Sequence, residues 1–347
     1  MARLEFASDY MEGCIPEILT RLTETNLEKS SGYGSDEHTA RAAELIREAC
    51  DAPDAEVHLL AGGTQTNRTV IGAMLKPWEG VIAADTGHIN VHETGAIEAS
   101  GHKVCAIEAP DGKLTPALVR EVMRRHCDGQ DEHMVLPRMA YISDTTELGT
   151  VYTKAELTAL RAACDAHGLY LYLDGARLAQ ALTAAGNDLR PEDLPQLCDA
   201  FYIGGTKNGL LFGEAMVIVN DALKPGFRRA MKRSGAMLAK GRLLGVQFAA
   251  ALEQDLWLDM GRHANTQAQR IAAALSNLGV PMYVPSPTNQ IFPILPDDQI
   301  ARLQERVAFH TNTRVDETHQ AVRFVTSWAT TDAQVDALLA LLNEVLG

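Results

Sequence analysis

The sequence lacks closely spaced cysteines, long apolar runs and a leader segment, and each absence excludes a class of protein. No CxxC pair occurs, so the sequence predicts neither a zinc site nor a disulfide framework, and we expect a reduced, cytoplasmic compartment. No apolar run approaches the roughly 20 residues that cross a bilayer, and the first residues, MARLEFASDY, contain no apolar signal-peptide core. The cysteines are scattered as Cys14, Cys50, Cys105, Cys127, Cys164 and Cys198.

Basic residues are also in the minority, because 31 Lys and Arg side chains stand against 45 Asp and Glu side chains and the net charge is −14. Nucleic-acid surfaces need basic patches that bind phosphates, so the sequence predicts no nucleic-acid partner. Apolar residues make up 46% of the chain and charged residues 22%, as in ordinary globular proteins. A length of 347 residues is enough for two domains with sizeable cores.

Strand-like and helix-like segments alternate through most of the chain. This alternation predicts an α/β fold with a mostly parallel sheet and helices on both faces. Thr115 and Pro116 are typical of a helix start, and Gly168 is typical of a helix end. The expected helices cover 39–51, 115–126, 153–168 and the segment after AGGTQTN, and the expected strands cover 56–60, 80–85, 103–109, 139–143, 169–174 and 200–205.

The alternation of strand-like and helix-like segments ends near Gly241. A long helical pattern over 241–278 precedes a Pro-rich piece, GVPMYVPSPTNQIFPILP. An amphipathic helix (298–309), the strand-like AVRFVTSWA and a last helix (331–346) follow. The sequence therefore predicts a large domain over 1–240 and a smaller C-terminal α+β domain over 241–347.

In an open α/β sheet, ligands bind beyond the carboxyl ends of the strands. The stretch GGTQTN, 62–67, follows an expected strand and opens an expected helix. Small residues and the free N–H groups of a helix N-terminus favour an anion there, and Thr64 adds a hydroxyl donor. The alternative is an ordinary capped turn. The stretch matches neither GxGxxG nor GxxxxGK[ST], so no dinucleotide or triphosphate site is predicted.

Two charged residues end neighbouring strands. Asp174 follows the apolar LYLYL, where an unpaired carboxylate is costly, so it needs either Arg177 or a protonated ligand nitrogen as partner. Lys207, in GGTKNG, has no acidic neighbour in sequence, which suits a lysine that becomes a neutral nucleophile, although a solvated turn lysine is the alternative. An amine, a carboxylate and an anion site on one edge match the needs of pyridoxal phosphate (PLP).

Histidines mark a fourth candidate segment, GHINVHETGA, over 87–96. His88 is able to stack on a flat ring or to act as a base. His88 and His92 are four residues apart, as metal ligands on one helix face would be. The chain has no HExxH motif and no evident third ligand, so we predict no metal site.

The order of these motifs resembles the threonine aldolase family of fold-type-I PLP enzymes, and most of all its low-specificity L-threonine and phenylserine aldolase branch. The resemblance implies an aspartate aminotransferase-like fold, assembled as a homo-oligomer, expected to be a tetramer built as a dimer of dimers. The matching motifs are FASD (6–9), YGSDEHTARA (33–42), GGTQTN, HINVHETGA, TTELGTVY, DGAR, GGTKNG and VRFVTSWATT (322–331).

The resemblance also implies residue roles. Lys207 matches the lysine that forms the Schiff base with the cofactor, and Asp174 matches the carboxylate on the pyridine nitrogen. Arg177 matches the arginine beside the phenolic oxygen and the substrate carboxylate, and His88 the histidine stacked on the ring. Phosphate would be held by Gly63, Thr64 and Thr206, the substrate carboxylate also by Ser8 and Arg323, and a neighbouring subunit's site would receive Arg242 and Tyr33.

The implied activity is cleavage of L-threonine, L-allo-threonine or a related β-hydroxy-α-amino acid to glycine and an aldehyde. One departure concerns the segment 143–149, SDTTELG, where many family members carry a second histidine tied to the β-hydroxyl. The preference between diastereomers therefore stays open. The alternatives are another fold-type-I enzyme, such as a β-eliminating lyase, an aminotransferase or a phenylserine-specific aldolase, and a PLP-binding module without catalysis.

Overall fold

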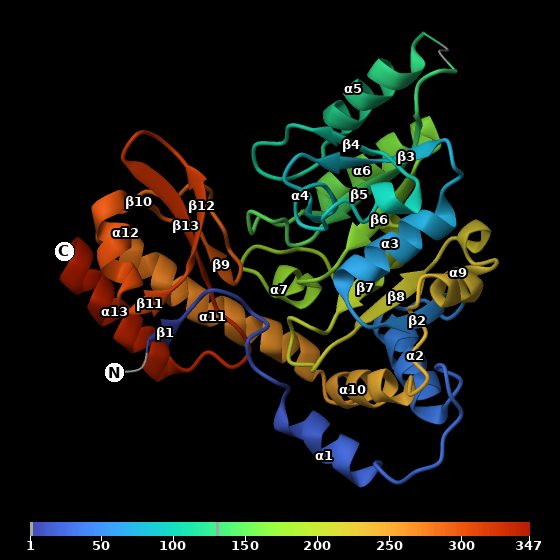
Figure 1. Ribbon diagram of the computed structural model, residues 1–347, viewed down its shortest axis with the longest axis horizontal. Coiled ribbons are helices and arrows are strands. Elements are labelled where there is room, and N and C mark those ends of the chain that lie inside the picture. The colour runs from blue at the N-terminus through green and yellow to red at the C-terminus, as the bar shows by residue number, and fades with distance from the viewer. Residues whose placement is uncertain (1–2, 130–131) are drawn as a thin grey trace.

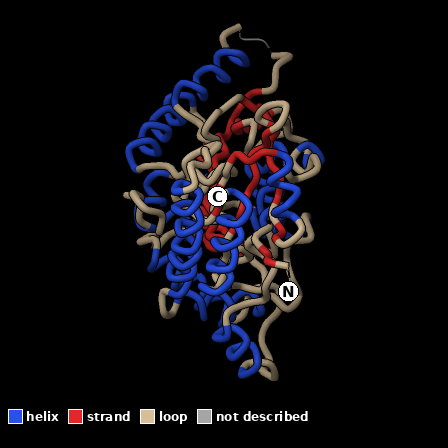
Figure 2. Tube along the Cα trace, turned by 90° about the vertical axis from the view of Figure 1, so that its left-hand side faces the viewer, coloured by secondary structure: helices blue, strands red, loops and turns tan. Residues whose placement is uncertain are grey.

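The computed structural model describes residues 3–129 and 132–347. Figure 1 shows a larger lobe around a central sheet and a smaller lobe formed by the C-terminal elements, with both chain ends at the smaller lobe. In Figure 2 the strands lie inside and the helices outside. The described helices that form the outer layers are α1 (Pro16–Glu24), α2 (Glu37–Ala49), α3 (Gly63–Met74), α4 (His88–Val91), α5 (Pro116–Cys127), α6 (Lys154–His167), α7 (Leu178–Leu182), α8 (Leu194–Leu197), α9 (Phe227–Arg233) and α10 (Arg242–Leu252).

The central sheet has seven strands in the order β2-β8-β7-β6-β5-β3-β4. Strand β8 is antiparallel to both of its neighbours, β2 and β7, and the other pairs are parallel. The predicted mostly parallel sheet is thus confirmed, but the sequence analysis missed β8. The strands are β2 (Glu56–Leu60), β3 (Glu79–Ala84), β4 (Val104–Ile107), β5 (Leu136–Ser143), β6 (Tyr170–Asp174), β7 (Ala200–Gly204) and β8 (Glu214–Ile218).

Both faces of the central sheet are buried, because alternate residues of each strand enter different cores. On β5, Ala140 and Ile142 pack in one cluster with α1, α2, α5, α6, α7, α8 and α10. Met139 and Tyr141 pack in the other cluster with α3 and α9. The helices therefore cover the sheet from both sides, as the alternation predicted.

The predicted helix starts and stops are confirmed at α5 and α6. Thr115 accepts a hydrogen bond from Leu118 N–H, and Pro116 is the first residue of α5. Thr153 and Glu156 form a reciprocal capping box at the start of α6. Gly168 ends α6 with a φ of 65°, a left-handed conformation that favours glycine.

The predicted helix over 241–278 is wrong as a single element. The structure has α10 and then α11 (Leu256–Asn277), and Asp255 between them has a φ of 54°. A residue in the left-handed conformation cannot continue a right-handed helix. The helical spacing of apolar residues therefore continues past Asp255, but in a second helix. Helix α10 packs in the large core against α2, and the C-terminal part of α11 enters the smaller core. The domain boundary at residue 240 stays a prediction.

The smaller core lies between the helices α11 to α13 and a sheet of the order β10-β13-β12, with β9 paired to β13. The predicted helix over 298–309 is shorter, since α12 ends at Gln304 and the chain turns into a strand at Val307. The elements are β9 (Gln290–Ile291), β10 (Ile294–Pro296), α12 (Asp297–Gln304), β11 (Val307–Ala308), β12 (His310–Arg314), β13 (His319–Val325) and α13 (Asp332–Leu346).

The N-terminal segment joins this smaller core. Strand β1 (Leu4–Glu5) pairs with β11 in parallel, and the backbone of Phe6 bonds to Ala308 at 2.9 Å and to Val325 at 2.9 Å. From there the chain crosses to α1 on the large lobe (Figure 1). Residues 8–10 therefore lie where the two lobes meet.

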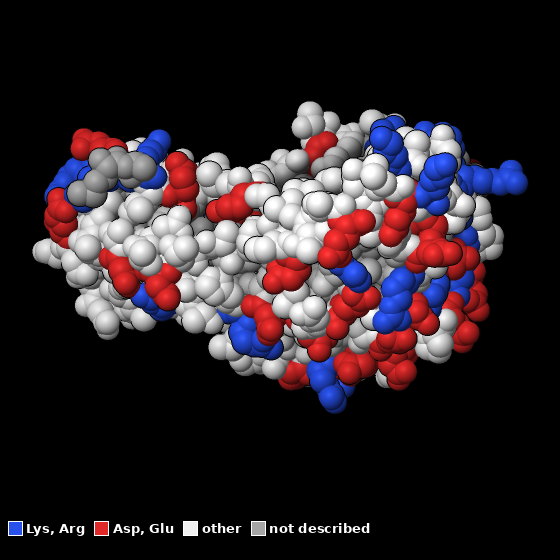
Figure 3. All heavy atoms as spheres, turned by 90° about the horizontal axis from the view of Figure 1, so that it is seen from below, with Lys and Arg blue, Asp and Glu red and all other residues white. Residues whose placement is uncertain are grey.

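The surface carries charges of both signs. Figure 3 shows acidic and basic side chains interspersed on one face, most densely toward the large lobe. Within residues 3–129 and 132–347, no helix is long and apolar enough to cross a membrane. The same residues contain no cluster of three or more His, Cys, Asp or Glu side chains placed to hold a metal ion.

Candidate active site

A cavity of about 640 Å³ opens at the carboxyl edge of the central sheet, where β2, β6 and β7 end and the antiparallel β8 begins. Its volume is within the usual range of small-molecule sites. Strands β12 and β13 of the smaller lobe close the other side. The lining residues that the sequence predicted as site residues are Gly63, Thr64, His88, Asp174, Arg177, Thr206, Lys207 and Arg323.

Asp174 is a buried carboxylate that four donors surround. It accepts hydrogen bonds from Tyr141 Oη at 2.6 Å, Asn67 Nδ2 at 2.9 Å and Ala176 N–H at 3.0 Å, and from Tyr202 Oη. Burial alone would raise the pKa of Asp174, but the nearby His88 charge and these donors outweigh burial and hold the pKa below its usual value. The carboxylate is therefore ionised and available to a cationic nitrogen.

A buried chain of polar groups joins Asp174 to His88. Asn67 Nδ2 also donates to Glu93 Oε1 at 2.7 Å, and His88 Nδ1 lies 2.8 Å from the same oxygen. Burial lowers the pKa of His88, but the hydrogen bond to Glu93 and the charges of Glu147 and Asp174 raise it above its usual value overall. Glu93 therefore fixes the orientation of the imidazole and favours its protonated form.

Lys207 lies in the turn that follows β7, after Gly205 and Thr206. Burial, followed by the positive charge of Arg177, lowers the pKa of Lys207 below its usual value. Its backbone is held in place, because Gln180 Nε2 lies 3.5 Å from the Lys207 carbonyl and Asn208 Nδ2 donates to the Trp257 carbonyl at 2.6 Å. Gly209 has a φ of 78°, and a Cβ there would lie 2.0 Å from Met260 Sδ, so this turn requires glycine.

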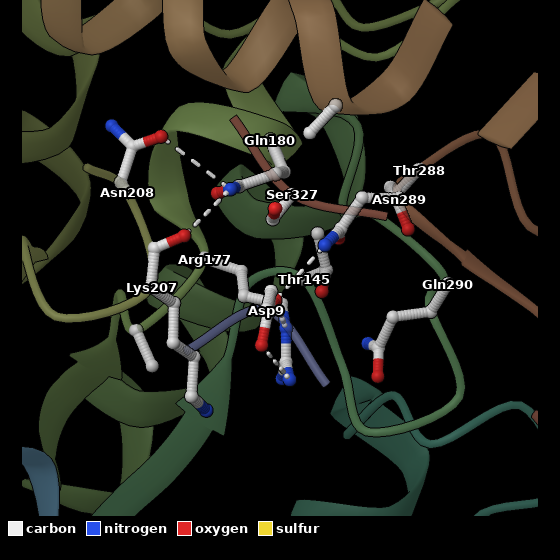
Figure 4. Close-up of polar contacts among 12 residues, drawn as sticks. Asp9, Thr145, Arg177, Gln180, Lys207, Asn208, Thr288, Asn289, Gln290 and Ser327 are labelled. Carbon is white, nitrogen blue, oxygen red and sulfur yellow. Dashed lines mark hydrogen bonds and ion pairs between the residues drawn. The ribbon is translucent and has the colours of Figure 1, made fainter. Parts of the chain in front are cut away.

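Arg177 forms an ion pair with Asp9, not with Asp174. Arg177 Nε lies 2.6 Å from Asp9 Oδ2, and Nη2 lies 3.1 Å from Oδ1. Figure 4 shows the Arg177 guanidinium and the Asn289 amide turned toward Asp9, and Asn289 Nδ2 donates to Asp9 Oδ2 at 2.9 Å. The sequence analysis gave Arg177 as one possible partner of Asp174, and this alternative is wrong. The Asp174 carboxylate is therefore available to another cationic partner.

Arg323, on β13, lines the cavity without an acidic partner among the described residues. Its Nη1 donates to Gln290 Oε1 at 3.3 Å, and its buried Nε has no hydrogen-bond partner there. Burial, then repulsion from Arg177, lowers the pKa of Arg323. A guanidinium that lines a cavity and has no acidic partner is suited to bind a carboxylate.

The predicted anion site lies at the start of α3. Gly62 is the extended N-cap of this 12-residue helix, and Gly63 and Thr64 line the cavity with the free N–H groups of its first turn. A Cβ at Gly63 would lie 3.3 Å from Tyr202 Oη, so a larger residue at this position would press against the Tyr202 side chain. Thr206 closes the same end of the cavity.

Three predicted residues do not line the cavity. Ser8 precedes the buried Asp9 on the segment that crosses between the lobes. Arg242, the first residue of α10, places Nη1 3.6 Å from Glu28 Oε2. Tyr33 is 46% exposed, and Lys232 Nζ lies 4.5 Å from its ring centre.

Several residues of the site were missed by the sequence analysis. Asn67 and Glu93 lie inside quoted motifs, GGTQTN and HINVHETGA, but their contacts depend on the fold. Glu147 lines the cavity in the segment that lacks the second histidine. The remaining missed residues are Asp9, Tyr10, Tyr141, Tyr202, Glu214, His310, Thr311 and Asn312.

Comparison with known proteins agrees with this geometry. The model of the beta-eliminating lyase family matches residues 5–297. The low-specificity L-threonine aldolase of Pseudomonas aeruginosa is 33% identical to the chain over 346 residues, which cover 99% of this chain and 98% of that protein. The chain belongs to the threonine aldolases of the beta-eliminating lyase family. The threonine aldolase of Saccharomyces cerevisiae is a more distant relative, 22% identical over 82% of this chain and 73% of that protein.

Solved structures agree with this family. The threonine aldolase of Leishmania major has a TM-score of 0.97 at 45% identity, with 99% of this chain and 100% of that chain covered. An aspartate aminotransferase double mutant of Thermus thermophilus has a TM-score of 0.74 at 18% identity, with 99% and 92% covered. The expected aspartate aminotransferase-like fold of type I is confirmed, and this family of folds is PLP-dependent.

The residues present fit that cofactor. An ionised carboxylate, a lysine with a lowered pKa and a helix N-terminus line one cavity. These are the groups that a protonated pyridine nitrogen, an aldehyde and a phosphate require.

Proposed function

We propose that this chain is a PLP-dependent aldolase that cleaves L-threonine, L-allo-threonine or related β-hydroxy-α-amino acids to glycine and an aldehyde. The observation that carries the proposal is the shared cavity of Lys207 and Asp174, in which Asp174 is ionised without any help from Arg177. The relatives are named for the same reaction, which supports the proposal.

The proposed cofactor contacts follow from the cavity. Lys207 would bind the aldehyde, Asp174 the pyridine nitrogen and His88 the face of the ring. Thr206 and the N–H groups at Gly63 and Thr64 would hold the phosphate. Bound PLP supplies an electron-accepting ring for the bond that breaks at the α-carbon.

The proposed substrate contacts lie on the opposite side of the cavity. Arg323 lines the cavity without an acidic partner among the described residues, and Arg177 Nη1 is not used by Asp9. Two guanidinium groups would fix the direction of the carboxylate, and that direction selects the bond cleaved at the α-carbon. Ser8 stays proposed as a third binder, although it lies outside the cavity lining.

Proton transfer at the β-hydroxyl is proposed to involve His88 or Glu147, both of which line the cavity. The hydrogen bond to Glu93 helps to raise the pKa of His88 against the effect of burial, and the protonated ring that this favours is suited to donate a hydrogen bond to the hydroxyl oxygen. A group that removes the hydroxyl proton must itself be unprotonated. Glu147, on the segment that follows β5, is the other candidate for this role, because it lines the cavity.

A second candidate function is β-elimination, which the matched family description favours. It would share Lys207 and Asp174 and differ in products. β-Elimination releases the β-hydroxyl as water, and hydrolysis of the resulting enamine gives a keto acid and ammonia, whereas aldol cleavage gives glycine and an aldehyde. An aminotransferase would instead pass the amino group to a keto acid.

We also propose a homo-oligomer, a tetramer built from dimers. The segment 10–33 exposes large apolar side chains, such as Leu27 at 90% and Leu19 at 52%, and Arg242 lies against Glu28 in this segment. This supports a subunit interface in which Arg242 and Tyr33 reach a neighbouring site. The six free cysteines, five of them buried, support the proposed cytoplasmic location.

The test uses purified protein with added PLP and three substrates: L-threonine, L-allo-threonine and phenylserine. Glycine and aldehyde should form in equal amounts from at least one of them. Formation of a keto acid and ammonia without glycine would contradict the aldolase and favour elimination. Cofactor binding without any product would favour a module without catalysis.

A further inference from the structure

Glu214 is a buried carboxylate at the phosphate end of the cavity. It is the first residue of β8, and because β8 is antiparallel, this residue pairs with Gly204 and Leu60, the last residues of β7 and β2. Glu214 is 3% exposed and lines the cavity together with Gly63, Thr64 and Thr206. A negative charge at this place would repel a phosphate.

Glu214 accepts hydrogen bonds from two donors of the Lys207 loop, while the Thr206 N–H donates to the Gly213 carbonyl. Thr206 Oγ1 donates to Glu214 Oε1 at 2.7 Å, and Gly205 N–H donates to Oε2 at 3.2 Å. Gly213 N–H in turn donates to Thr206 Oγ1 at 3.0 Å. With Glu214 ionised, the only proton of the Thr206 hydroxyl therefore points to Glu214 and is not available to a ligand.

A proton on Glu214 changes this arrangement. Its O–H would donate to the second lone pair of Thr206 Oγ1, since Gly213 N–H uses the first. The Thr206 hydroxyl proton would then be free to point into the cavity. The same two oxygens, 2.7 Å apart, would keep their hydrogen bond with its direction reversed.

We propose that the phosphate of the cofactor binds only when Glu214 carries a proton, because this proton reverses the hydrogen bond to Thr206 and turns the Thr206 hydroxyl toward the phosphate. The inference rests on the proposed function, since it takes the cavity to hold a phosphorylated cofactor. Glu214 is thus a positioning residue that acts through Thr206, and the proton comes from solvent.

The surroundings of Glu214 favour the proton. Burial raises the pKa of Glu214 to about 8, against the hydrogen bond from Thr206 and the charge of Lys207, and the charge of Asp174 adds to the rise. No described residue forms an ion pair with Glu214, and Lys207 acts on it only through its nearby charge. A nearby dianion would raise this pKa further. The titratable groups on the strands and loop around Glu214 are Lys207, Asp174, Tyr172, Tyr202 and, further along β2, His58, which pairs with Glu56.

The test measures proton uptake when pyridoxine 5′-phosphate binds to the cofactor-free protein. This probe lacks the aldehyde, so no covalent link to Lys207 forms. Calorimetric titrations in two buffers of different ionisation enthalpy give the number of protons taken up, at pH 6.5 and at pH 9. Glu214→Gln is the matched variant, since its amide donates to Thr206 at every pH.

At pH 9 the wild-type protein should take up nearly one proton more than Glu214→Gln, and at pH 6.5 the two should agree. Above about pH 8 the wild-type affinity should fall by up to tenfold per pH unit relative to the variant. Pyridoxine, which lacks the phosphate, should show no difference between the proteins. The exposed carboxylate variant Glu108→Gln should behave as wild type.

If both proteins bind pyridoxine 5′-phosphate and their affinities depend on pH in the same way, the inference on Glu214 is overturned. The proposed function would still stand. No binding of either probe or of PLP by either protein would overturn both. If Glu214→Gln does not fold, the comparison between pyridoxine 5′-phosphate and pyridoxine on wild-type protein still decides. Equal proton uptake with the two probes at pH 9 would contradict the inference.

Discussion

Asp9 and Arg177 are 168 residues apart in the chain and form a buried ion pair with two contacts, Nε to Oδ2 at 2.6 Å and Nη2 to Oδ1 at 3.1 Å. Asp9 is 0% exposed and Arg177 is 5% exposed. The pair joins the N-terminal segment, which belongs to the smaller core, to the loop after β6 in the larger lobe. The arginine proposed to meet the substrate carboxylate is therefore held by both lobes.

Asp9→Asn should both destabilise the protein and weaken substrate binding. Removal of one partner of a buried pair leaves a buried charge and costs about 3–5 kcal/mol. The free guanidinium should also turn out of position, so KM should rise more than tenfold while cofactor binding is kept. Thermal unfolding and steady-state kinetics measure the two effects.

The control for this prediction is Glu344→Gln, which breaks the exposed ion pair with Arg306 at 2.7 Å. An exposed pair contributes at most about 1 kcal/mol, so this variant should resemble wild type. An Asp9→Asn protein with unchanged KM would show that the pair does not position Arg177.

Lys207→Ala should leave the fold intact and reduce turnover by about a thousandfold or more, because the nucleophile is lost. Lys207→Arg should not restore activity, since a guanidinium stays protonated. Lys240→Arg, outside the cavity, is the control. Borohydride reduction of the PLP-loaded wild-type protein, followed by peptide mapping, should place the cofactor on Lys207. Attachment to Lys232 or Lys240 would contradict the central assignment.

Glu93→Gln should lower the pKa of His88, because the variant loses the carboxylate that favours the imidazolium. The sign follows from the charge: a neutral amide no longer stabilises the protonated ring, so the ring loses its proton at lower pH. The His88 titration observed by NMR should move to lower pH. The part of the pH–activity curve that depends on the ionisation of His88 should move with it. Glu98→Gln, at an exposed carboxylate nearby, should change neither. An unchanged titration would show that Glu93 does not control the ring.

The enzyme should accept only the L configuration at the α-carbon and should accept both configurations at the β-carbon. Thr145 and Thr146 are buried and hydrogen-bonded within their own loop, and they do not line the cavity. Values of kcat/KM for L-threonine and L-allo-threonine should therefore be comparable. A preference above about a hundredfold, nearly 3 kcal/mol of transition-state discrimination, would show that another group, such as Glu147, reads the hydroxyl.

The sequence predicted the elements whose signals are local. Helix caps at Thr115 and Thr153 depend on neighbouring residues, and the positions of Asp174 and Lys207 follow from strands that end in recognisable turns. Contacts between distant segments have no such signal. Nothing in FASD indicates that Asp9 pairs with Arg177, and β8 was missed because its antiparallel direction depends on its neighbours. Missing β8 also hid Glu214, which the reversed strand brings to the cavity.

The stability of the cofactor-free protein should depend on pH through Glu214. Its pKa is about 8 in the folded protein, against about 4.3 in an unfolded chain. A raised pKa means that the folded state binds more protons in this window, so stability is fully present below about pH 4.3 and is lost as the pH rises toward 8. The slope is about 1.4 kcal/mol per pH unit for one group.

Glu214→Gln removes this dependence, so the difference in unfolding free energy between variant and wild type should grow in favour of the variant from about pH 5 to pH 8. Other groups titrate equally in both proteins and cancel in the difference. Denaturant unfolding at fixed protein concentration measures it, with Glu108→Gln as the control that should follow wild type. A constant difference across this pH range would mean that Glu214 is already ionised in the folded protein. Binding of pyridoxine 5′-phosphate would then have to be accompanied by the uptake of this proton at pH 6.5 as well as at pH 9, and its absence at both would contradict the proton-linked contact to Thr206.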